Sequence, residues 1–277
     1  MFVALDKNNN LIDINNTSKN EEYFCKFCNE KLIIKAKNSI HKAPHFCHKR
    51  NSNCVKEWAQ HDMSEWHKNW QSYFPLENRE VILKNDIVKH IADIFINNTV
   101  IEFQHSPISY KNFNNRNQFY TSLGCSVIWV FDATDNIVFS EKDHCDCWKN
   151  VQNQFENLNC YNNRVLIFLE VIKNGTPCLF KPKELTPTKI IPDTGFYSYF
   201  FLRESFLKTF GILVPENILS IPELMSIYNT PIQRTNCLFP RKSYNTPRIR
   251  GARIDYVINN QLNKKGGYRN YNNRKKK

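Results

Sequence analysis

The sequence has no apolar run that approaches the about 20 residues needed to cross a lipid bilayer. It also lacks a secretory signal pattern, because the apolar stretch at residues 1–5 is short and runs into a polar segment, Asp6-Lys-Asn-Asn-Asn10. We therefore expect a cytoplasmic protein without a membrane-bound part. Thiols stay reduced in the cytoplasm, so the ten cysteines need an explanation other than a disulfide framework.

Acidic residues are nearly missing from the C-terminal end of the chain. From Arg241 onward twelve Lys or Arg stand against one acid, Asp255, so this end carries +11 of the net charge of +12. A basic tail suits an acidic polymer, and DNA is the first candidate partner. A solubilising tail is the alternative that composition leaves open.

Four of the cysteines lie between residues 25 and 54, together with His45 and His48. A Cys-x2-Cys pair, a gap of sixteen residues and a His-x2-His pair offer the four ligands that a structural zinc ion requires. The predicted ligands are Cys25, Cys28, His45 and His48. The second spacing is tighter than the common one, so Cys47 or Cys54 could replace one histidine. Because this segment has few large apolar residues, a metal explains it better than a small core with reduced cysteines.

Two runs rich in β-branched and aromatic residues, 90–96 and 99–105, predict a β-hairpin. The Asn97-Asn98 pair between them tolerates the positive φ of a tight turn. A two-residue loop fixes the register, so Asp93 is expected to face Glu102. Two like charges in that position destabilise a sheet. Either one acid turns out into solvent, or the register slips by one residue, or a divalent cation lies between the two acids.

A helix is predicted on the N-terminal side of this hairpin, from about residue 62 to 74. Its apolar stripe is Met63, Trp66, Trp70 and Phe74. Glu65 flanks the stripe, and it either belongs to a capping box with Asp62 or reaches the metal site from the helix.

A second helix is predicted after the hairpin, with Ser109 as its N-cap and Gly124 at its C-terminal end. Arg116 lies on an otherwise apolar stripe of this helix. Its guanidinium either extends outward to solvent or meets a phosphate or an active-site carboxylate. The apolar run 125–131 then predicts a buried strand parallel to the strand before the helix.

Residues 133–277 carry fewer signals. Two apolar runs on either side of Asn174-Gly175 predict a hairpin, and segments 199–210 and 222–228 are expected to be helical. The predicted fold class is α/β, with a mixed α+β C-terminal region.

The predicted order from residue 62 to 132 is α-β-β-β-α-β, which resembles the restriction-endonuclease-like core of PD-(D/E)XK nucleases. The resemblance implies that Asp93 and Glu102 bind Mg²⁺. Most members of that superfamily carry a Lys two residues after the Glu, and this chain has Gln104 there. Gln can orient a water by hydrogen bonding but brings no positive charge.

A wider set of motifs resembles the competence protein CoiA family over residues 1 to about 135. The motifs are Cys25-x2-Cys28, His45-Phe-Cys-His48, Ser64-Glu-Trp-His67, Ile91-Ala-Asp93, Ile101-Glu-Phe-Gln-His-Ser106-Pro-Ile-Ser109 and Arg116-x3-Tyr120. This resemblance implies a zinc-finger-like N-terminus, a nuclease-like domain and a role in DNA processing during transformation. Recombination or DNA-uptake proteins are then the expected partners besides DNA.

The function implied is a Mg²⁺- or Mn²⁺-dependent deoxyribonuclease with structural Zn²⁺. Asp93, Glu102 and the Phe103 carbonyl would bind the catalytic ion, with Glu65 and Gln104 completing the catalytic set. The alternative is a DNA-binding protein with an inactive nuclease fold, which Gln104 keeps open.

The expected organisation has four parts: a zinc-finger-like segment (1–60), a nuclease-like domain (61–135), a C-terminal α+β region (136–265) and a basic disordered tail (266–277). The predicted nucleic-acid contacts are Lys49, Arg50, Arg116, Arg248, Arg250 and Arg253.

Overall fold

The computed structural model describes residues 1–18, 20–40, 42–49, 54, 64–86, 88–135, 138–139, 164–173, 175–181, 184–185, 190–191 and 199–229. Four predicted DNA contacts lie outside the described residues, and so does the predicted tail 266–277. These contacts are Arg50, Arg248, Arg250 and Arg253.

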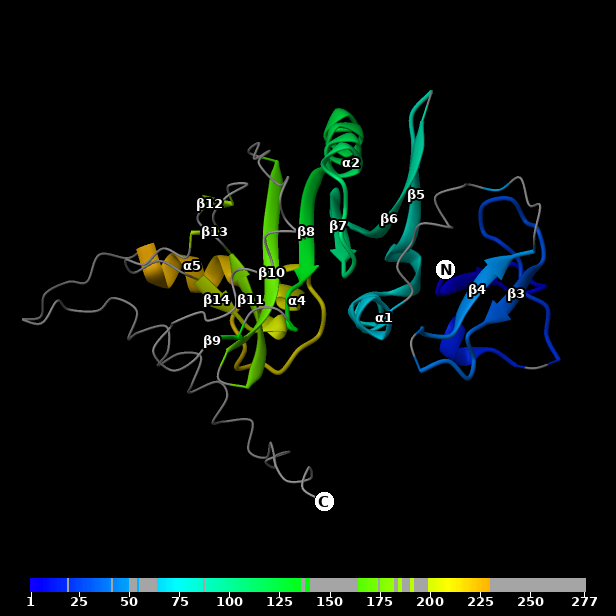
Figure 1. Ribbon diagram of the computed structural model, residues 1–277, viewed down its shortest axis with the longest axis horizontal. Coiled ribbons are helices and arrows are strands. Elements are labelled where there is room, and N and C mark those ends of the chain that lie inside the picture. The colour runs from blue at the N-terminus through cyan, green and yellow to red at the C-terminus, as the bar shows by residue number, and fades with distance from the viewer. Residues whose placement is uncertain are drawn as a thin grey trace, which may run out of the picture.

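A mixed eight-stranded sheet forms the centre of the molecule, in the order β14-β11-β10-β8-β7-β6-β5 with β9 paired to β10 (Figure 1). In chain order its strands are β5 (Arg79–Lys84), β6 (Lys89–Ile96), β7 (Thr99–Gln104), β8 (Ser126–Asp132), β9 (Val138–Phe139), β10 (Val165–Lys173), β11 (Thr176–Lys181) and β14 (Tyr199–Phe201). The central strands β7, β8 and β10 run parallel to one another, and they are apolar on both faces. Such strands have to be covered on both sides.

Helices cover the two faces of this sheet. They are α1 (Glu65–Ser72), α2 (Tyr110–Ser122), α4 (Arg203–Thr209) and α5 (Ile221–Asn229). Phe113 and Tyr120 of α2 pack in one buried cluster with Trp129 of β8. The side chains of α1, α4 and α5 pack in a second cluster with alternate strand residues such as Phe103 and Val130. The predicted order α-β-β-β-α-β is therefore confirmed as α1-β5-β6-β7-α2-β8.

The predicted hairpin is strands β6 and β7. Asn97 and Asn98 take φ values of 48° and 56°, and Ile96 pairs with Thr99. The regular pairing ends at Ile94 and Ile101, one position before the two acids.

The sequence predicts the start of helix α2 more accurately than the start of helix α1. Ser109 caps α2 as predicted, since its hydroxyl accepts from the Asn112 N–H. Helix α1 has Ser64 as its N-cap and so begins later than the predicted start near residue 62. Asp62, the residue of the predicted capping box, lies outside the described residues.

The N-terminal part of the chain contains two small hairpins and packs beside the sheet. The strands are β1 (Val3–Leu5), β2 (Leu11–Asp13), β3 (Leu32–Lys35) and β4 (His45–His48), with 3-10 turns η1 (Ile14–Asn16) and, before β5, η3 (Leu76–Asn78). Phe2, Tyr23 and Phe46 share a buried cluster with Ile91 of β6. The N-terminal unit and the sheet therefore share a core.

The C-terminal region predicted for residues 136–265 adds strands to the central sheet instead of building a separate core. Strand β10 pairs with β8 across the boundary predicted at residue 135, and the predicted hairpin at Gly175 joins β10 to β11. The segment 199–210, expected to be one helix, is strand β14 followed by α4. A further pair, β12 (Glu184–Leu185) and β13 (Ile190–Ile191), lies off the sheet.

Candidate functional site

Four potential metal ligands meet in the N-terminal unit. They are Cys25, Cys28, His48 and Cys54, whose ligand atoms all lie within 4.8 Å of one another. The Sγ atoms of Cys25 and Cys54 are 3.8 Å apart, and Cys28 Sγ lies 3.3 Å from His48 Nε2. A tetrahedral ion with Zn–S bonds of about 2.3 Å needs sulfurs about 3.8 Å apart. The residues therefore fit a metal such as zinc.

The structure corrects one predicted ligand of this cluster, His45. His45 and His48 lie three residues apart on strand β4, and side chains on a strand alternate between faces. His48 points to the cysteines, whereas His45 Nδ1 lies 2.8 Å from the Ala43 carbonyl oxygen. Cys54 supplies the fourth ligand atom, which is one of the two alternatives left open by the sequence; Cys47 is not in the group.

The protonation state of this cluster also suits a metal ion. Burial lowers the pKa of His48, which favours the neutral imidazole that binds metals. Burial raises the pKa of the Cys25 thiol, so in the absence of a cation this sulfur keeps its proton. A bound cation favours the thiolate, which makes metal binding release protons.

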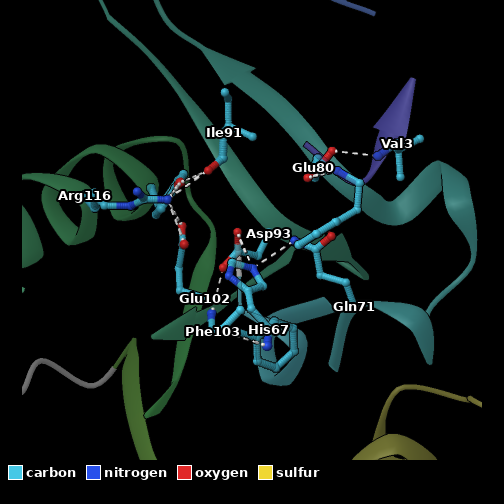
Figure 2. A network of polar contacts seen from close by, with 12 residues as sticks. Val3, His67, Gln71, Glu80, Ile91, Asp93, Glu102, Phe103 and Arg116 are labelled. Carbon is cyan, nitrogen blue, oxygen red and sulfur yellow. Dashed lines mark hydrogen bonds and ion pairs between the residues drawn. The ribbon is translucent and has the colours of Figure 1, made fainter. Parts of the chain in front are cut away.

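A second polar cluster lies at the junction of α1, β6 and β7 (Figure 2). His67, Asp93 and Glu102 are each only 2% exposed. His67 Nε2 lies 3.2 Å from Asp93 Oδ1, and the Phe103 N–H donates to Asp93 Oδ2 at 2.8 Å. Gln71, one turn after His67, places its Nε2 atom 3.0 Å from His67 Nε2.

Arg116 of α2 holds the other acid of this cluster. Its Nη2 atom donates to both oxygens of Glu102 at 2.7 Å and to the Ile91 carbonyl at 2.9 Å (Figure 2). Tyr120, one turn later on α2, donates its hydroxyl to the same carbonyl. Of the two outcomes predicted for Arg116, the structure thus shows the carboxylate contact, and its side chain is 19% exposed; its predicted role as a nucleic-acid contact stays a prediction.

The electrostatics of the cluster are dominated by burial. Burial raises the pKa of Glu102 to about 7, with Arg116 acting against this rise and the nearby Asp93 charge adding to it. Burial alone would lower the pKa of Arg116, but the Glu102 charge outweighs it and the pKa is raised. Two acids are therefore brought close enough to repel each other in an apolar setting, as the hairpin register implied.

Both halves of this architecture match known family models. The model of the competence protein CoiA N-terminal domain matches residues 6–57, and that of the competence protein CoiA nuclease-like domain matches residues 55–205. The chain belongs to the competence protein CoiA family. No curated protein and no solved structure gave a match. The nuclease-like match extends from α1 to α4, in agreement with the continuous sheet.

Two predicted catalytic residues of the CoiA nuclease-like domain make side-chain contacts outside the acidic cluster of His67, Asp93 and Glu102. The Glu65 side chain is 59% exposed and lies 3.6 Å from Lys68, so Glu65 does not reach Asp93. His67, two residues later, takes that place. Gln104 donates its amide to the Ser106 carbonyl at 2.6 Å, which turns the amide nitrogen toward the following loop. Lys49 is exposed directly after β4, as a phosphate contact requires.

Sequence inspection missed the junction between the CoiA N-terminal and nuclease-like domains, which centres on two adjacent residues of β5. Arg79 donates to Asp13 Oδ2 at 2.5 Å and to the carbonyls of Ser72 and Phe74 at the end of α1. Lys26, next to the candidate metal ligand Cys25, donates to the Arg79 carbonyl at 2.6 Å. One arginine thus ties the N-terminal unit to the helix that carries His67.

Glu80 completes this junction. Its φ of 50° lies in the left-handed region, and the β5–β6 register passes over it from the pair Arg79–Ile94 to the pair Val81–Ala92. Its carboxylate accepts the N–H groups of Phe2 at 2.7 Å and Val3 at 3.1 Å. The Phe2 ring in turn lies 5.9 Å from the His67 ring. Phe2, directly before β1, therefore packs beside the histidine of the acidic cluster.

No helix in the described part of the chain combines the length and hydrophobicity of a membrane span.

Proposed function

We propose that the protein is a metal-dependent DNA nuclease of the PD-(D/E)XK type that acts in DNA processing or recombination linked to competence. The observation that carries the proposal is that His67 of α1 meets Asp93 of β6 at a buried point, with the buried Glu102 of β7 near enough for the Asp93 charge to act on it. An imidazole and two carboxylates form a donor set that suits Mn²⁺ or Mg²⁺. The N-terminal cluster, by contrast, would hold a structural Zn²⁺.

The acidic cluster fits a divalent cation on two further observations. The Asp93 charge contributes to the raised pKa of Glu102, and a cation would relieve this repulsion. In addition, the Oε1 atom of Gln71 is buried and has no hydrogen-bond partner within the described residues. Buried hydrogen-bond acceptors rarely lack a partner, and a bound ion or a water molecule on that ion would supply one for Gln71 Oε1.

In this proposal His67, Asp93, Glu102 and the Phe103 carbonyl are the candidate ligands. A bound Mg²⁺ or Mn²⁺ would lower the pKa of a water molecule and offset the charge that develops on the phosphate.

The other residues of the cluster hold these groups in place. The Arg116 charge opposes the rise that burial causes in the pKa of Glu102, and the Phe103 N–H fixes one oxygen of Asp93. Gln104 has the hydrogen-bonding capacity to align a water, at the position where related enzymes use a Lys.

Cleavage of several DNA forms with Mg²⁺ or Mn²⁺ tests the proposal. Asp93→Asn should abolish cleavage, because it removes a negative ligand without changing the size of the side chain. Asp86→Asn is the matched control, since Asp86 is exposed in the turn between β5 and β6. Loss of cleavage in both variants, or in neither, would contradict the assignment of the site.

The alternative function is DNA binding by an inactive nuclease fold, and Gln104 is the observation that favours it. A wild-type protein that binds DNA but never cuts it with either ion would support this alternative. For both functions, removal of the tail from residue 251 should lower the salt dependence of binding to duplex DNA by about 0.9 per lost phosphate contact. An unchanged dependence would remove the tail from the DNA-binding surface.

A further inference from the structure

Two neighbouring sides of helix α1 each contact a different buried carboxylate, Asp93 on one side and Glu170 on the other. His67 faces Asp93 on one side. Trp66 and Trp70, four residues apart, direct their indole N–H groups to Glu170 on strand β10. Residues four apart share one face of a helix, and each residue turns the helix by about 100°. The direction of the tryptophan stripe therefore determines the direction of His67.

The Glu170 carboxylate of strand β10 accepts hydrogen bonds from side chains of both α1 and α4. The side chain is fully buried. Its Oε2 atom accepts from Trp66 Nε1 at 2.5 Å and from Trp70 Nε1 at 3.0 Å. Its Oε1 atom accepts from the Arg203 Nε atom of α4, and the Arg203 guanidinium lies 4.9 Å from the centre of the Trp70 ring. The charge of Glu170 is thus balanced inside the core, and both of its oxygens are used.

The rotation of α1 depends on these contacts because the helix is short. Eight residues do not form a stable helix alone, so the surroundings set its position. A side-chain atom roughly 5 Å from the axis moves by about 1.7 Å when the helix turns by about 20°. Such a rotation would break both indole hydrogen bonds to Glu170 and would shift His67 relative to Asp93.

We propose that Glu170, held by Arg203, is a positioning residue that sets the rotation of α1 and so directs His67 to Asp93. This inference rests on the proposed function, in which His67 is a metal ligand. Glu170 itself belongs to β10, contacts the neighbouring face of α1 through Trp66 and Trp70, and is not among the proposed metal ligands.

Glu170→Asp tests this role in the full-length, zinc-loaded protein. It keeps the charge but withdraws the carboxylate by about 1.5 Å, the length of one carbon–carbon bond. Trp66→Phe removes one of the two indole N–H donors and keeps an aromatic ring, so it tests the same contact if the first variant does not fold. Glu77→Asp is the matched control, because Glu77 is exposed after α1.

Three measurements distinguish positioning from packing: the urea midpoint, the NMR signal of the His67 ring without added Mn²⁺, and the affinity for Mn²⁺. We expect the His67 signal to move and the Mn²⁺ affinity to fall at least tenfold in Glu170→Asp and Trp66→Phe, the loss typical of residues that orient metal ligands. Glu77→Asp should leave both unchanged. A lower urea midpoint with an unchanged His67 signal and unchanged affinity would overturn the proposal. If the wild-type protein binds no Mn²⁺, the proposed function fails, and the His67 signal still decides whether Glu170 positions the helix.

Discussion

The contact between Glu80 and the N-terminal strand allows a quantitative prediction about how the two halves of the molecule are joined. The Glu80 carboxylate accepts two buried backbone N–H groups, from Phe2 and Val3. In Glu80→Gln the amide oxygen can accept only one of them. A buried donor left without an acceptor costs about 1–3 kcal/mol. We therefore expect Glu80→Gln to lower the free energy of unfolding by that amount, and Glu80→Ala to lower it by about twice as much.

The backbone of Glu80 provides an internal check on this estimate. A left-handed φ costs a residue with a Cβ atom about 1–2 kcal/mol, whereas glycine adopts it readily. Glu80→Gly should therefore be less destabilising than Glu80→Ala, although both lose the same carboxylate.

Hydrogen exchange at the Phe2 and Val3 amides measures the effect at the contact itself. A loss of 1–3 kcal/mol corresponds to an increase in exchange of about 5- to 150-fold. Glu77→Gln is the control, since this exposed side chain lies three residues before Glu80. Unchanged exchange at Phe2 and Val3 in Glu80→Gln would show that the carboxylate does not hold the N-terminal strand.

Three further predictions concern the two candidate metal sites. His48→Ala should lose zinc to a chelator that leaves the wild-type protein loaded, whereas His45→Ala should retain it, as metal analysis after dialysis would show; equal loss in both would contradict the ligand set. Arg116→Met should destabilise the fold by about 3–5 kcal/mol in urea unfolding, because Glu102 is left as a buried charge without its partner, and the double variant with Glu102→Gln should recover part of this loss. Without Mg²⁺ or Mn²⁺, burial raises the pKa of Glu102 from an ordinary 4.5 to about 7, so the folded state holds this proton more tightly than the unfolded chain. The stabilisation is complete below about pH 4.5 and is lost as the pH rises through 7, and Glu102→Gln should remove this part of the pH dependence.

Local signals in the sequence were sufficient for the hairpin and for helix α2. The Asn97-Asn98 turn is fixed by two neighbouring residues that accept a positive φ, and Ser109 caps α2 through its own side chain. Such features depend on contacts within a few residues. They can therefore be predicted without knowledge of the tertiary structure.

The choice between neighbouring side chains depended on which face of an element meets the site. The stripe of Trp66 and Trp70 indicates which side of α1 faces the sheet, but Glu65 and His67 flank this stripe on opposite sides. Only the packing against β6 determines that His67 is the residue that reaches Asp93. The wrong prediction of His45 as a ligand has the same cause. His45 and His48 lie on opposite faces because this segment is strand β4, and the sequence alone did not show that it is a strand.

Long-range polar contacts left no pattern in the sequence. Glu170 lies 100 residues after Trp70, with which it shares a hydrogen bond, and Glu80 lies 78 residues after Phe2. A single acid in an apolar strand indicates that a partner exists, but not which residue it is. These contacts therefore became visible only in the folded chain.

The central claim is that His67, Asp93 and Glu102 form one cation site, and direct titration with Mn²⁺ tests it. In zinc-loaded protein followed by electron paramagnetic resonance, the wild type should bind Mn²⁺ in addition to its zinc. Asp93→Asn should lose this binding, while Asp86→Asn should keep it. Binding of Mn²⁺ that is the same in wild type and Asp93→Asn, or no binding in the wild type, would contradict the site.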